Sequence, residues 1–95
     1  AAANSNSHLK TVGVVTGGVH IAGTNITSPT NLDAALGDWT GKSFVNEIDM
    51  FLNGVLLRGA ATGIHDVYPG TTAASGDVMF TFKVKTGDVV TMSIY

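Results

Sequence analysis

The chain has 95 residues, contains no cysteine and carries a formal net charge of −2. This length fits a single domain, and a chain without thiols has no disulfides, cysteine nucleophiles or cysteine-ligated zinc. Its five Lys and Arg residues are spread singly and form no basic cluster that could bind phosphate groups. Nucleic-acid binding is therefore not expected.

The composition is apolar for a chain without a membrane helix. Hydrophobic residues make up 44% of the sequence and charged residues only 13%, against about a quarter charged in ordinary domains. No apolar run approaches the roughly 18 residues that span a bilayer, so membrane insertion is not expected. The surplus apolar surface therefore indicates a protein partner, most simply a second copy of the chain.

The N-terminal quarter predicts an arm followed by a hairpin. Ala1 to Ser7 is small and polar, and we interpret it as a flexible or partner-ordered arm that precedes one β domain over residues 8–95. His8 to Val15 has strand composition, Gly17-Gly18 fits a tight reversal, and Val19 to Asn25 is the expected returning strand.

One short helical turn is expected between Ser28 and Leu36. Ser28 suits the cap, Pro29 suits the first turn, and Gly37 ends the segment. A helix of about two turns is marginal alone, so Leu32 and Leu36 would have to pin it against the sheet.

The middle of the chain carries the clearest strand pattern. Apolar residues alternate over Phe44 to Asn53, with Met50 on the more apolar face. Asn53-Gly54 is a strong hairpin signal because both residues tolerate the positive φ of a type I′ turn, and Val55 to Arg58 would return. Residues 59–76 are expected to be mainly loop, with a brief strand at Ile64 to Tyr68.

Two further strands complete the predicted fold. Asp77 to Lys85 alternates, Gly87 and Asp88 turn the chain, and Val89 to Tyr95 closes it. We therefore predict an all-β domain, a small antiparallel β-sandwich or barrel with one short helical turn.

The second half resembles β-modules of bacteriophage tail fibres and related virion appendages. The resemblance is carried by Asp49 to Leu57, Gly76 to Phe82 and Thr86 to Tyr95, which form an apolar-Asn-Gly-apolar hairpin followed by two strands, the last introduced by Gly-Asp and ending in an aromatic residue. A similar layout is found in a domain of unknown function of phages and spore-coat proteins. The resemblance implies a location in the virion, at the particle surface or tail, assembly as a homotrimer with other virion proteins as partners, and a role in host adsorption.

Two predicted strands, Phe44 to Asn53 and Val89 to Tyr95, carry apolar residues on both faces. Because a single core uses only one face of a strand, the other face predicts an oligomer interface. The predicted interface residues are Phe51, Val89, Thr91 and Tyr95. The predicted structural turn residues are Asn53, Gly54, Gly87 and Asp88.

No catalytic, cofactor or metal site is expected, so we do not expect an enzyme. His8, His20 and His65 form no ligand pair at i, i+2 or i+4, and the acidic residues are scattered over caps and turns. We interpret the histidines as solvated or internally bonded; a metal shared on a symmetry axis is the alternative.

The sequence is compatible with three functions. The first is a tail-fibre or appendage module, and the second is a capsid decoration (cement) protein that bridges shell subunits by its arm. The third, a carbohydrate-binding module for host surface sugars, needs exposed aromatic rings, for which Trp39, Tyr68 and Tyr95 are available. Trp39 and Tyr68 are therefore candidate receptor or partner contacts, and a Trp39 folded over the rim of its own core is the alternative.

Overall fold

The computed structural model describes residues 9–95, apart from the side chain of Leu9; the expected arm at Ala1 to Ser7 and His8 lie outside the described residues. The strands are β1 (Leu9–Val14), β2 (Val19–His20), β3 (Asn25–Ile26), β4 (Ile48–Leu52), β5 (Val55–Leu57), β6 (Val67–Pro69), β7 (Val78–Phe80), β8 (Val84–Lys85) and β9 (Val89–Ile94). They form three antiparallel sheets, so the predicted all-β class, consistent with a small sandwich, is confirmed.

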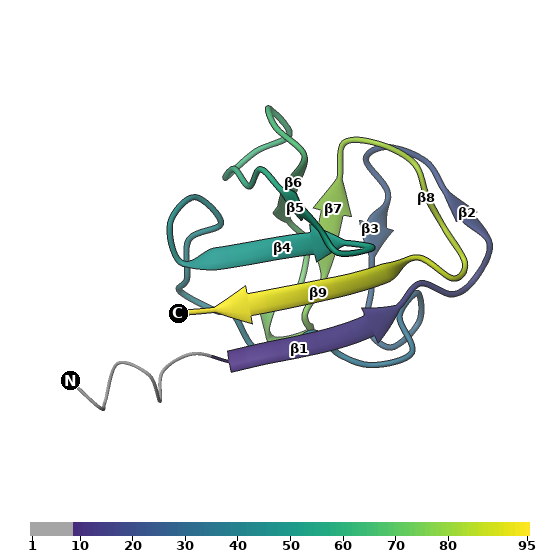
Figure 1. Cartoon of the computed structure of the whole chain (residues 1–95), viewed down its shortest axis with the longest axis horizontal. Helices are drawn as coiled ribbons and strands as arrows, with labels where there is room; N and C mark the ends of the chain where they lie inside the picture. The colour runs from purple at the N-terminus through teal and green to yellow at the C-terminus, as the bar shows by residue number, and fades with distance from the viewer. Residues whose placement is uncertain (1–8) are drawn as a thin grey trace.

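The four-stranded main sheet has the order β1-β9-β4-β5. Its central strands are β4 and β9, which pair from Ile48↔Ile94 to Leu52↔Val90 (Figure 1). The two-residue turn after β4 returns the chain as β5, in the register Leu52↔Val55. The predicted Asn-Gly hairpin is therefore present.

The two ends of the described chain form one bent antiparallel ribbon. β1 pairs β9, β2 pairs β8, and β3 pairs β7. From Val14 to Val19 the chain advances by five residues, whereas the partner segment from Lys85 to Val89 advances by four. The pairing is therefore offset by one residue, as at a β-bulge. The expected hairpin between His8 to Val15 and Val19 to Asn25 is therefore wrong, because both segments pair with the C-terminal part of the chain.

The segment Ser28 to Leu36 is not a helix, which corrects a second expectation. Leu32 bridges Val15, and the Asp33 N–H donates to the Val14 carbonyl at 3.1 Å, so strand β1 takes the backbone groups that a helix would use. The helical turn of the fold is the 3₁₀ helix η1 (Ala73–Ser75). Leu32 is nonetheless fully buried, as expected for a side chain that holds this segment against the sheet.

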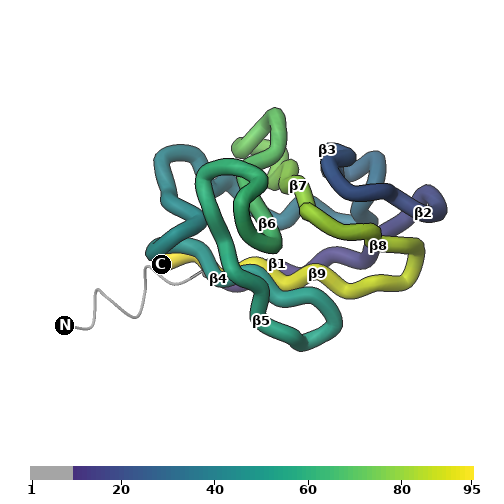
Figure 2. Tube along the Cα trace, turned by 90° about the horizontal axis from the view of Figure 1, so that it is seen from above, coloured from purple at the N-terminus to yellow at the C-terminus, as the bar shows by residue number. Residues whose placement is uncertain are grey.

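The core lies on one face of the main sheet. Figure 2 shows β3, β6 and β7 on that side of β1 and β9. Inward residues of β4 and β9 such as Met50 and Met92 are buried, and they belong to one cluster with Phe80 and Leu36 from the covering segments. Residues that alternate with them point to the opposite, uncovered side of the sheet.

Candidate functional site

The uncovered side of the main sheet carries a row of four side chains, one from each strand. The register places Val12 opposite Thr91, Thr91 opposite Phe51, and Phe51 opposite Leu56. We call these four residues the outer row. Three of the four are apolar, on a sheet face that none of the core residues covers.

The outer row is accessible. Val12 is 50% exposed and Leu56 59% exposed, whereas Phe51 and Thr91 between them are half-buried. On the inner face of the same central strands, Met50 is 1% exposed. The sheet therefore has an apolar inner face that packs against the core and an apolar outer row that is open to solvent.

The structure brings the four predicted interface residues to one face. Phe51 and Thr91 are direct cross-strand partners, and Val89 lies two residues before Thr91 in β9. Tyr95 follows the same strand and is 46% exposed. Val12 and Leu56 were not predicted from the sequence. The Asn-Gly hairpin register carried the signal for Leu56, whereas Val12 requires knowledge of the β1–β9 pairing.

A polar row borders the outer row at the C-terminal end of β9. It contains Lys10, Ser93 and Asp49 in register, and Ser93 is buried, so this end of the face is covered. The Tyr95 hydroxyl donates to Asp49 Oδ2 at 2.6 Å. This hydrogen bond to a carboxylate is the main cause that raises the pKa of Tyr95, because ionisation would remove the donor proton.

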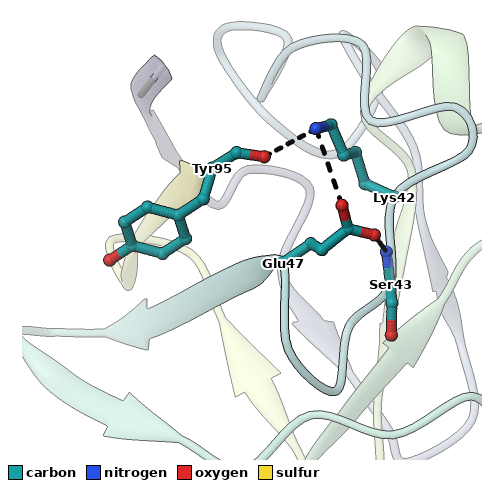
Figure 3. A network of polar contacts seen from close by, with 4 residues as sticks. All are labelled: Lys42, Ser43, Glu47 and Tyr95. Atoms are coloured by element: carbon teal, nitrogen blue, oxygen red, sulfur yellow. Dashed lines mark hydrogen bonds and ion pairs between the residues drawn. The ribbon is translucent and has the colours of Figure 1, made fainter. Parts of the chain in front are cut away.

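Tyr95 is held by its backbone as well. Its N–H donates to the Glu47 carbonyl at 2.9 Å, and Lys42 Nζ donates to its carbonyl at 2.6 Å. Lys42 Nζ also lies 3.7 Å from Glu47 Oε2, and Glu47 Oε1 accepts the Ser43 N–H at 3.1 Å (Figure 3). The end of β9 is thus fixed to the loop that precedes β4.

The predicted turn residues occupy two turns at the other end of β9. Asn53 and Gly54 have φ of 52° and 84°, as a type I′ turn requires, and Gly87 has φ of 98°. Asn53 Oδ1 accepts the Val89 N–H at 2.8 Å, and Asp88 Oδ2 accepts the Lys85 N–H at 3.0 Å. Side-chain acceptors therefore continue the ladder where regular strand pairing stops.

An aspartate closes part of each edge of the main sheet. At the β1 edge, Asp33 Oδ1 accepts the Val14 N–H at 2.7 Å while the Asp33 N–H donates to the Val14 carbonyl. At the β5 edge, Asp66 Oδ2 accepts the Arg58 N–H at 3.0 Å while the Asp66 N–H donates to the Arg58 carbonyl at 2.9 Å. We call these two arrangements the aspartate clasps. They satisfy edge groups that would otherwise template pairing with another chain.

The candidate receptor contacts are placed differently. Trp39 is 5% exposed and packs edge to face on Phe44, with ring centroids 4.9 Å apart. Of the two alternatives for Trp39, this is the ring packed on its own core, and it leaves no open face for a sugar. Tyr68 is half-buried, and its ring lies beside Gly63. A row of exposed aromatic rings is therefore missing from the described part of the chain.

The histidines are also separated. His20 is 8% exposed and its Nε2 lies 2.7 Å from the Thr16 carbonyl oxygen, which makes it an internal hydrogen-bonding group. His65 is half-buried in a loop. Within residues 9–95 no group of three or more His, Asp or Glu side chains is arranged to hold a metal ion.

Comparison with protein-family models, with curated proteins and with solved structures found no significant match to this chain. In the part of the chain that the structure describes, no helix is long and apolar enough to cross a membrane.

Proposed function

We propose that this chain is a structural module of a virion, a tail fibre or other surface appendage, that assembles with copies of itself through the outer row. The observation that carries the proposal is the row itself, in which Val12, Phe51 and Leu56 present apolar side chains on the uncovered face of the main sheet. An exposed apolar surface on a chain with 13% charged residues favours association. The trimeric state and the virion location come from the resemblance described above.

The polar surroundings of the row also support an interface. Interfaces combine an apolar centre with a polar rim. Lys10, Asp49 and Tyr95 lie on the same face beside the row and supply that rim. A capsid decoration protein would use the same surface, and its further requirement, an arm at Ala1 to Ser7, lies outside the described residues. Binding to host sugars is not part of the proposal, because Trp39 is buried.

The test compares two neighbouring residues of β5. Leu56 belongs to the outer row and is 59% exposed, whereas Val55 is 64% exposed on the other side of the strand. In sedimentation velocity we expect the unmodified chain to be an oligomer, Leu56→Lys to be a folded monomer, and Val55→Lys to keep the oligomer, since only the first buries an unpaired charge. A monomeric unmodified chain at micromolar concentration would refute the proposal, and a stable dimer would refute the trimer only.

Phe51→Lys is a second test of the same row. Tyr95→Lys is a poorer one, because it also removes the internal hydrogen bond to Asp49. Circular dichroism of each variant must show unchanged strand content, so that loss of the oligomer reports on the surface and not on the fold.

A further inference from the structure

An open groove lies at one end of the main sheet. It has a volume of about 750 Å³ and lies between the loop that precedes β4 and the segment that follows β5. Three of its lining side chains are aliphatic and largely exposed: Val45 at 67%, Leu56 at 59% and Ile64 at 73%. This is the size range of sites that bury a compact apolar group.

A pair of exposed β-branched side chains lies beyond the other end of the sheet. Val19 is 61% exposed and Ile21 70% exposed, while His20 between them is buried. Alternation along the chain therefore puts Val19 and Ile21 on the same outward side. We call this pair the β2 knob.

The knob and the groove of one molecule are far apart. The groove includes Ile48, which opposes Ile94 at the end of β9, whereas the knob follows the pair Val14↔Val89 at the start of β9. Figure 1 shows β2 and the start of β4 at opposite ends of the long axis. A molecule cannot place its own knob in its own groove, so a contact between them joins two copies.

The charges around the two surfaces are complementary. Lys85 is the cross-strand partner of Val19, Lys83 is exposed nearby in sequence, and one carboxylate, that of Asp88, lies near Lys85. Cations therefore outnumber anions beside the knob. The groove holds the carboxylates of Asp49 and Asp66 with one guanidinium, that of Arg58. Each carboxylate accepts a hydrogen bond within the chain through its Oδ2 atom, and its further lone pairs can accept an ammonium group.

We infer that the β2 knob of one copy docks in the groove of the next, head to tail. This inference rests on the proposed assembly function and names a second, heterologous contact for it; the groove borders the outer row and shares one residue with it, Leu56. Heterologous contacts generate rings when the rotation between copies closes and filaments when it does not, so they extend an assembly beyond a symmetric pair.

The experiment uses a charge swap on the full chain. Ile21→Asp places a carboxylate opposite the acidic groove, and Ile64→Lys places an ammonium opposite the basic knob. Both positions are more than two thirds exposed, at 70% and 73%, so neither change should affect folding. Each variant alone should associate at least about tenfold more weakly, because like charges then face each other across the contact.

Mixing the two variants gives the decisive result. The knob that carries Ile21→Asp then meets the groove that carries Ile64→Lys, and the unmodified knob of one variant meets the unmodified groove of the other. We therefore expect the mass in sedimentation velocity to return to that of the unmodified chain. Val55→Asp, which lies on neither surface, is the control and should assemble normally.

Two outcomes overturn the inference. If Ile21→Asp and Ile64→Lys assemble like the unmodified chain, the head-to-tail contact does not exist, while an effect of Phe51→Lys, which lies outside the groove, would still support the outer row. If each variant is impaired but the mixture is not restored, the two surfaces do not bind each other. An unmodified chain that is monomeric contradicts both the inference and the proposed function.

Discussion

Asn53 Nδ2 donates a hydrogen bond to Asp88 Oδ1 at 3.2 Å, which joins the side chains of the two turns that flank the start of β9. The two residues are far apart in the sequence, and each also accepts a backbone N–H, from Val89 and from Lys85. The turn that returns β4 as β5 is therefore tied to the turn that leads from β8 into β9. This link holds the start of β9 beside the end of β4.

Removing the Asn53 side chain should destabilise the fold. Asn53→Gly keeps the positive φ of the turn but leaves the Val89 N–H without its acceptor, so we expect a loss of about 1 to 2 kcal/mol in the free energy of unfolding. The double change Asn53→Val with Gly54→Val should cost about 1 to 3 kcal/mol through turn strain. Urea unfolding measures both, and an unchanged midpoint in either variant would contradict the role given to the turn.

Stability should fall at acid pH in part through Asp88. The Lys85 backbone N–H that its carboxylate accepts is the largest cause that holds the pKa of Asp88 below the usual 3.8. Because the folded state favours the charged form, this contribution is present above the unfolded pKa and is lost as the pH falls through the lower folded pKa.

Melting temperatures of the unmodified chain and Asp88→Asn test this dependence. The advantage of the unmodified chain should be present at neutral pH and shrink at acid pH, below the usual 3.8, as the carboxylate of Asp88 becomes protonated. A difference between the two proteins that is equal at both pH values would show that the carboxylate charge does not matter.

The aspartate clasps should be visible in amide hydrogen exchange. In Asp66→Ala the Arg58 N–H loses its carboxylate acceptor, and its exchange should accelerate about tenfold or more. In Asp33→Ala the same should hold for the Val14 N–H. Each variant is the control of the other, because the amide of the intact clasp should keep its protection. Acceleration at both amides in both variants would mean global destabilisation instead.

At Gly59 the backbone passes so close to the backbone of Phe44 that no side chain fits. A Cβ at this position would lie 2.2 Å from the carbonyl oxygen of Phe44, which is backbone and cannot rotate away. Gly59→Ala should therefore destabilise the fold by about 2 to 3 kcal/mol. Gly63→Ala, whose Cβ would meet the Tyr68 ring at 3.4 Å, is the matched control and should be nearly neutral. Equal melting temperatures for the two variants would contradict this close approach.

Local pattern was sufficient for the part of the sheet that carries most of the outer row. The alternation around Met50 predicted β4, and Val89 to Tyr95 was predicted as the closing strand. The Asn-Gly turn fixed the β4–β5 register that puts Leu56 beside Phe51. These features are encoded within a few residues, since side-chain period and turn chemistry depend on near neighbours.

The local sequence was not decisive where the same residues suit two different structures. Ser28 and Pro29 suit a helix start, but they also suit a turn, and the bridge between Leu32 and Val15 selected the turn. Trp39 could be either an exposed loop residue or a ring packed on its own core, and contact with Phe44 buries it. In both cases tertiary contacts, and not the local signal, decided the outcome.

The sequence by itself determined the all-β class, the period of the central strands and the positive-φ turn at Asn53 and Gly54. Only the tertiary structure decided that β1 pairs with β9 and β2 with β8, which places Val12 in the outer row and separates the β2 knob from the groove. Neighbouring strands pair more often than distant ones, so local signals favoured a hairpin at Gly17 and Gly18. The pairing of the two chain ends instead depends on how all strands together bury one core, and that balance is not written in any single segment.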